Sequence, residues 1–173
     1  MINDVQGLRS ALIQAGIAME ADLAGCSAGE IDALEQRYGT LPASYRQVLA
    51  LIGHGAGRLV DRAEFWIYAD QTGRIHEQVQ AYLAEVRAEG GEVPDIPADA
   101  VFISARYGEW PHFVRAGSAP DAAVHVFNYD DESIAKAYDS VWDWIADFVA
   151  DAQFFLALGS SRGTPPSDGG AGP

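Results

Sequence analysis

Hydrophobic residues recur three to four positions apart in five stretches of the chain, which is the spacing of one face of an amphipathic helix. The expected helices cover residues 2–15, 28–38, 42–52, 73–89 and 140–158. In the first of them Val5 and Leu8 share a face, and Asn3 is the expected N-cap. Residues 17–23 fit either a short strand or a loop.

The second and third helices have clear start and stop signals. Ser27 followed three positions later by Glu30 is a capping box, in which each side chain binds the other residue's backbone amide. Gly39 supplies the left-handed residue that ends this helix. Pro42, which has no amide hydrogen, suits the first turn of the next helix. The glycines within residues 53–57 then break that helix and allow a turn with positive φ.

Short segments rich in β-branched and aromatic residues predict strands between these helices. They cover residues 58–60, 65–68, 100–105, 112–115 and 123–129. The last three are joined by short, turn-rich connections, which favours antiparallel hairpins. Bulky residues alternate on both faces of 123–129, so we expect this strand to be central and covered on both sides. The pattern predicts an α+β fold: an antiparallel sheet of about five or six strands with N-terminal helices, a middle helix and a C-terminal helix packed around it.

The domain organisation follows from length and composition. A chain of 173 residues fits one domain with enough residues to bury a core, and we expect that domain to span residues 1–158. Residues 159–173 lack the apolar content that would offset the entropy of ordering, so we expect a disordered tail. Cys26 is the only cysteine, the start does not resemble a signal peptide, and no apolar run is long enough to cross a membrane. These features favour a cytoplasmic protein.

The formal charge of −14, from 25 acidic and 11 basic side chains, narrows the range of partners. Phosphate contacts require clustered Lys and Arg, so the charge argues against binding to nucleic acid or to an anionic membrane. It is compatible with a basic protein partner, because complementary potentials speed association. It is equally compatible with a role in solubility alone.

Three patterns resemble catalytic or ligand-binding motifs, and each has a simpler interpretation. Residues 25–29 match G-x-S-x-G, but the nucleophile elbow needs a buried strand before it, and Ser27 already caps a helix. His112 and His125, with the acids of 130–132, could bind a metal, yet they lack the close spacing of metal motifs. Residues 53–57 resemble a phosphate loop but follow a helix and lack the Lys-Ser/Thr pair. We therefore expect no enzyme activity and no catalytic, cofactor-binding or metal-binding residues.

Acidic and aromatic residues in the expected turns are better candidates for function. An exposed tryptophan surrounded by carboxylates suits a protein interface, where aromatic side chains anchor the partner and charges steer it. The alternative is that the tryptophan packs over the sheet and the acids are solvated turn residues. The candidate partner-binding residues are Asp61, Glu64, Glu109, Trp110, Asp130, Asp131 and Glu132.

Residues 27–152 resemble the SUKH superfamily, the Smi/Knr-like group. The resemblance rests on an acidic amphipathic helix with Ile31, Leu34 and Glu35, on Leu41-Pro42, and on a following aromatic and leucine that lead into a glycine turn. A serine that starts a Trp- and Phe-rich terminal helix also fits. The glycine turn reads Gly-His-Gly at residues 53–55, where the family pattern has Asn-Gly-Gly.

What the resemblance implies is a non-enzymatic role. Many members resemble immunity proteins that bind and neutralise a cognate toxin, often a nuclease, of a bacterial polymorphic toxin system. The expected partner is then a protein toxin with a basic surface. Two alternatives stay open: a regulatory or scaffolding protein-binding module of the Smi/Knr type, and a small serine hydrolase that uses Ser27.

Overall fold

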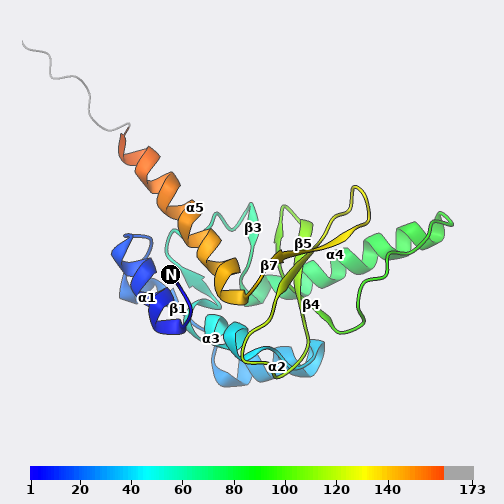
Figure 1. The fold of residues 1–173 in the computed structure, drawn as a ribbon, viewed down its shortest axis with the longest axis horizontal. Coiled ribbons are helices and arrows are strands. Elements are labelled where there is room, and N and C mark those ends of the chain that lie inside the picture. The colour runs from blue at the N-terminus through cyan, green and yellow to red at the C-terminus, as the bar shows by residue number, and fades with distance from the viewer. Residues whose placement is uncertain (162–173) are drawn as a thin grey trace, which may run out of the picture.

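Five α-helices and two antiparallel sheets make up the described part of the chain, residues 1–161 of a computed structural model (Figure 1). The helices are α1 (Val5–Gln14), α2 (Ala28–Tyr38), α3 (Ala43–Ile52), α4 (Ala69–Ala88) and α5 (Val141–Ser161). A 3-10 turn, η1, covers Glu20–Asp22. The predicted α+β fold class is confirmed. Most of the expected tail, residues 162–173, lies outside the described residues.

The larger sheet is an antiparallel meander with the strand order β3-β4-β5-β6-β7. Its strands are β3 (Phe65–Trp66), β4 (Ala100–Arg106), β5 (Glu109–Arg115), β6 (Val124–Phe127) and β7 (Ile134–Tyr138). The smaller sheet pairs β1 (Leu23–Ala24) with β2 (Gly55–Ala56). Because neighbouring strands run in opposite directions, the loop before β3, the β4–β5 turn and the β6–β7 turn all lie at one end of the larger sheet, the upper end in Figure 1.

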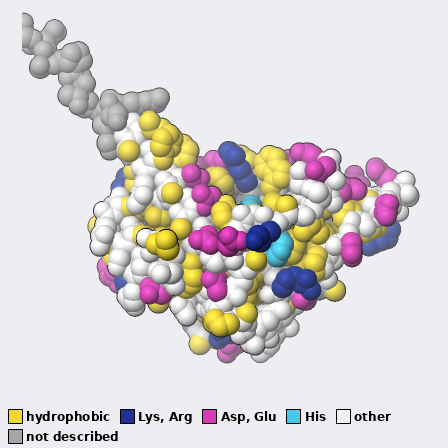
Figure 2. Space-filling model, in the orientation of Figure 1, with side chains coloured by type: hydrophobic (Ala, Val, Ile, Leu, Met, Phe, Trp, Pro, Cys, Tyr) yellow, Lys and Arg dark blue, Asp and Glu magenta, His cyan; other side chains and the backbone are white. Residues whose placement is uncertain are grey.

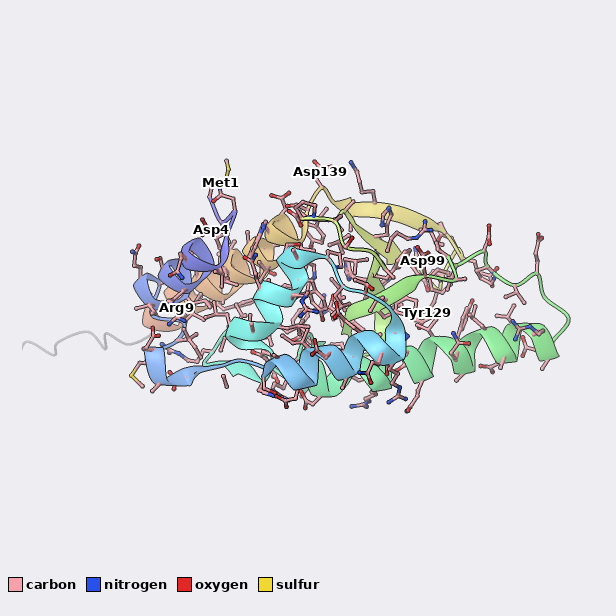
Figure 3. All side chains as sticks on the ribbon, turned by 90° about the horizontal axis from the view of Figure 1, so that it is seen from below. Met1, Asp4, Arg9, Asp99, Tyr129 and Asp139 are labelled. Carbon is pink, nitrogen blue, oxygen red and sulfur yellow. The ribbon has the colours of Figure 1, made fainter. Side chains whose placement is uncertain are left out.

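Each face of the larger sheet is covered by helices. On one face Phe102 and Phe113 form a core with Ile75 and Val79 of α4, the helix that lies along the sheet in Figure 3. Tyr82 of the same helix packs against further aromatic rings at the end of β6. The other face carries the main core, which includes buried side chains of β4, β5 and β6 together with those of α1, α3 and α5. The sheet is therefore held between two helical layers.

The helix start signals are confirmed for α2 and differ in detail for α1 and α3. The Glu30 amide donates to Ser27 Oγ at 3.3 Å, and the Ser27 amide donates to Glu30 Oε2 at 2.8 Å, so the capping box is formed. The expected cap of α1 was wrong by one residue, because Asp4 Oδ1 accepts the Gly7 amide at 2.7 Å. Pro42 lies just before α3, at its N-cap position, and not in its first turn. None of the helices in the described residues combines the length and the apolar character needed to span a bilayer.

Several strand predictions were wrong in detail. Residues 58–60 form a turn, because Gly57 adopts φ +55° and directs the chain away from β1. Of the glycines in 53–57, Gly57 alone has a positive φ. The segment 65–68 contributes only the two residues of β3, and α4 begins at Ala69, four positions earlier than expected.

The other differences concern the end of the sheet. The strand β7 was not predicted, and it pairs with β6, so the segment 123–129 contributes an interior strand as expected, while the middle strand of the five is β5. Glu109 and Trp110, expected in a turn, are the first residues of β5. The reason is a tight turn in which Tyr107 and Gly108 have φ values of +51° and +82°, so that the strand resumes at once.

Candidate protein-binding surface

The turns and strand ends that carry the seven candidate contact residues lie at one end of the larger sheet, the upper end in Figure 1. Two of these residues precede β3, two open β5, and three form the β6–β7 turn. We call this surface the acidic end. It comprises Asp61, Glu64, Glu109, Trp110, Asp130, Asp131 and Glu132.

Glu64 is tied to the sheet by an ion pair with Arg106. Its Oε1 accepts from Arg106 Nε at 2.7 Å and lies 2.6 Å from Nη2. Its backbone carbonyl accepts the Tyr107 amide at 2.7 Å. The Arg106 guanidinium in turn lies over the Phe65 ring, 5.4 Å from its centroid. Glu64 therefore orders the loop before β3, and its charge is partly neutralised within the chain.

Two aromatic side chains are exposed beside this ion pair. Tyr107 is 61% exposed and Trp110 is 39% exposed. Trp110 has φ +46°, a backbone conformation that non-glycine residues rarely adopt and that is common at binding sites. The turn thus presents a tyrosine and a tryptophan next to the carboxylate of Glu109.

The β6–β7 turn is ordered by polar contacts within the turn and by a contact from α4. The Ser133 amide donates to Asp131 Oδ1 at 3.1 Å, and hydrogen bonds from the Ser133 side chain and from this amide lower the pKa of Asp131. The Tyr82 hydroxyl donates to Glu132 Oε1 at 3.0 Å. Burial, followed by the neighbouring Tyr82 and Glu109, raises the pKa of Tyr129 to about 12. Figure 3 shows Tyr129 on the sheet side of α4.

A groove of about 320 Å³ lies between α5 and the loop before β3. Its apolar lining is Leu59, Val60, Phe65, Phe148 and Phe155 among others, and Phe155 is 66% exposed. Its acidic lining includes Asp61 and Glu64, so the groove is continuous with the acidic end. Sequence reasoning missed the groove, because residues 58–60 were expected to be a strand, whereas they form part of its lining.

Helix α5 adds acidic residues that were not predicted as contacts. Asp143, Asp147 and Asp151 are exposed and follow one another at four-residue intervals, which places them on one side of the helix. Asp147 Oδ2 accepts from the Tyr138 hydroxyl at 2.8 Å, and Asp151 lines the groove. Figure 2 shows acidic side chains along α5 and at the upper edge of the sheet. The regular spacing was a signal present in the sequence.

The structure also shows where the residues of the G-x-S-x-G match and of the histidine pair lie. Ser27 has ordinary extended backbone, with φ −67° and ψ 161°, and its hydroxyl is used in the capping box, so it lacks the strained geometry of a nucleophile elbow. In the β5–β6 ladder His112 lies opposite Val126, and His125 lies opposite Phe113, one residue further along each strand. The two histidines therefore point to opposite faces of the sheet and do not form a metal site together.

No protein-family model matches the chain, and no curated protein matches it either. The chemistry of the acidic end and the groove is therefore the basis for a functional proposal. This surface combines exposed carboxylates, exposed aromatic rings and an apolar groove, which together suit a protein partner with complementary charge.

Proposed function

We propose that this chain is a non-enzymatic immunity protein that binds and neutralises a cognate protein toxin with a basic surface. The observation that carries the proposal is the gathering of the acidic end and the adjoining groove on one side of the molecule. The resemblance of residues 27–152 to the SUKH superfamily supports the assignment to toxin neutralisation, and so does the net charge of −14.

The two parts of the surface have different roles in recognition. The exposed carboxylates of Glu109 and Asp130 steer a basic partner and set its orientation, while Tyr107, Trp110 and Phe155 provide the aromatic contact area. Arg58 also lines the groove, so it provides a pairing position for a carboxylate of the partner. A nuclease toxin needs a basic cleft for its substrate, and an acidic inhibitor that covers this cleft would block it.

The experiment tests binding to the protein encoded next to this chain. The neighbouring protein's toxic domain is co-expressed with the chain, and growth rescue and complex formation are measured. The surface variant combines Glu109→Gln with Asp130→Asn, and the control combines Glu77→Gln with Asp95→Asn, which removes the same charge from exposed positions outside the acidic end. We expect the surface variant to associate at least about tenfold more slowly, and Trp110→Ala to dissociate faster, with the control unchanged.

Several outcomes would contradict the proposal. Equal association rates for the surface variant and its control would show that the acidic end does not contact the toxin. If the association rate of the wild-type chain does not fall as the salt concentration is raised, electrostatic steering does not contribute to binding. The absence of both growth rescue and complex formation would reject the immunity role. Capture of a non-toxic protein through the same surface would instead favour a regulatory module.

A further inference from the structure

Three potential metal ligands meet at a place that no sequence motif marks. One ligand atom each of Cys26, Glu30 and His54, namely a thiol sulfur, a carboxylate oxygen and an imidazole nitrogen, all lie within 4.8 Å of one another. His54 Nε2 and Glu30 Oε1 are 2.9 Å apart. Sequence reasoning treated these residues separately, as a lone thiol, a helix-capping acid and a member of a glycine-rich turn.

Backbone contacts hold these three residues in place. The His54 amide donates to the Ala24 carbonyl at 2.7 Å, next to the β1–β2 pairing, and the Cys26 amide donates to the Leu49 carbonyl at 2.9 Å. Glu30 follows Cys26 by four positions and is fixed through Oε2, which accepts the Ser27 amide. Its other oxygen, Oε1, is the one that faces His54. Each of the three residues is thus held in place by a hydrogen bond that does not involve the other two.

Gly53 allows the thiol to lie against the end of α3. A Cβ added at Gly53 would overlap Cys26 Sγ and the Leu49 carbonyl oxygen. Since any side chain at this position would displace the thiol, the close approach of backbone and sulfur depends on this glycine.

The cluster opens into a cavity of about 440 Å³ next to the start of α4. Cys26 is 7% exposed and lies deep in the site, while Glu30 and His54 are exposed at its mouth. Asp70 of α4 lines the same cavity. Arg62 connects the two sides, because it donates to the His54 carbonyl at 2.9 Å and to Asp70 Oδ2 at 2.6 Å. The cavity leaves room for a water molecule beside the three ligands.

The surroundings of Cys26 do not suit a nucleophile. Cys26 is buried, and the carboxylates of Glu30 and Asp70 line the same cavity, whereas a catalytic cysteine lies beside a positive charge that stabilises its thiolate. A divalent cation would compensate these charges and bind the sulfur as a thiolate. The same three groups therefore suit metal binding better than thiol catalysis.

We propose that Cys26, Glu30 and His54 form a binding site for a borderline transition-metal cation, for which Zn²⁺ is the best match. Zinc binds sulfur at about 2.3 Å and nitrogen or oxygen at about 2.0–2.2 Å, so tetrahedral ligand atoms lie roughly 3–4 Å apart. The separations of these atoms, at most 4.8 Å, need to shrink by up to about 1 Å, which rotation of the exposed His54 side chain supplies while Glu30 stays fixed. Three protein ligands leave a fourth position for water from the cavity. This proposal is independent of toxin binding.

The test uses the full chain with any purification tag removed, because a histidine tag would itself bind metal. Co²⁺ is titrated first, since coordination by Cys26 gives a thiolate-to-cobalt charge-transfer absorption in the ultraviolet, and Zn²⁺ affinity is then measured by calorimetry. We expect one ion per chain. Cys26→Ala removes the charge-transfer band, and Cys26→Ala and His54→Gln each weaken Zn²⁺ binding at least about tenfold. Ser10→Ala, which changes an exposed residue of α1 outside the cluster, keeps the wild-type affinity.

Two results would overturn the proposal. One is the absence of a charge-transfer band in the wild-type chain, and the other is equal Zn²⁺ affinity for wild type and His54→Gln. Circular dichroism of each variant checks its folding. Should Cys26→Ala fail to fold, the exposed position of His54 still provides a decisive variant.

Discussion

The indole N–H of Trp144 donates a hydrogen bond to the hydroxyl oxygen of Ser104 at 3.2 Å. Both residues are 1% exposed, so the bond joins α5 to β4 where water cannot replace either partner. A buried donor that loses its acceptor costs about 1–3 kcal/mol. This contact therefore makes the position of α5 on the sheet specific.

Replacing Ser104 by alanine should lower the free energy of unfolding by about 1–3 kcal/mol, because the Trp144 N–H is left buried without an acceptor. Urea unfolding at neutral pH measures the change. In a double-mutant cycle with Trp144→Phe, which removes the donor, the two effects should not add. Additive effects would mean that the hydrogen bond contributes nothing measurable.

Gly53 and Gly55 provide a matched pair for testing close packing. Alanine at Gly53 would overlap Cys26 Sγ and the Leu49 carbonyl oxygen, so we expect a loss of about 1–3 kcal/mol in unfolding free energy. A Cβ at Gly55 meets nothing within 4 Å, and its φ lies outside the left-handed region, so Gly55→Ala should be nearly neutral. Thermal and urea unfolding of both variants gives the comparison, and equal losses would contradict the packing argument.

Ser27→Ala removes one half of the capping box of α2 and should cost about 1 kcal/mol of stability. Ser10→Ala is the control, because Ser10 is exposed within α1 and caps no helix. Urea midpoints measure both changes. If the chain hydrolyses a test ester and Ser27→Ala abolishes this activity without lowering stability, Ser27 is a nucleophile and not a cap.

Lowering the pH from 7 to 5 should destabilise the fold through His76. Its Nε2 accepts the Phe102 amide at 3.1 Å, and its ring stacks on Tyr38 with centroids 4.0 Å apart. Burial, followed by the charge of Arg37, lowers the pKa of His76 to about 4, so the unfolded chain binds a proton in this range while the folded chain does not. The contribution of His76 to the free energy of unfolding is therefore fully present above the pKa of about 6.5 that histidine has in the unfolded chain, and it is lost as the pH drops towards 4.

The expected loss from His76 is on the order of 1 kcal/mol between pH 7 and pH 5. His76→Gln does not titrate, so the stability difference between the two pH values should shrink in this variant. It should not vanish, because burial also lowers the pKa of His112 to about 4. Carboxylates with a lowered pKa, such as Glu35 beside Arg46, lose their contribution only at lower pH. An unchanged pH dependence in His76→Gln would refute the assignment.

Local signals were sufficient for most of the helices. The Ser27–Glu30 capping box and Gly39, which has φ +109°, each depend only on residues within a few positions. They can therefore be recognised without knowledge of the tertiary structure. In contrast, four of the five residues of β7 are exposed, so this strand has no hydrophobic alternation and depends on its pairing with β6. Its edge position explains why the pattern could not predict it.

The candidate sites, like the secondary structure, depend partly on local sequence and partly on tertiary contacts. The sequence by itself determined which residues are acidic or aromatic and that they lie near strand ends, because those properties depend on composition and local turns. Only the tertiary structure decided that they share one end of the sheet, since this depends on the antiparallel order of strands distant in the chain. It also brought Cys26 and His54 together through a two-residue ladder between β1 and β2, a contact too short and too distant in sequence to leave a local pattern.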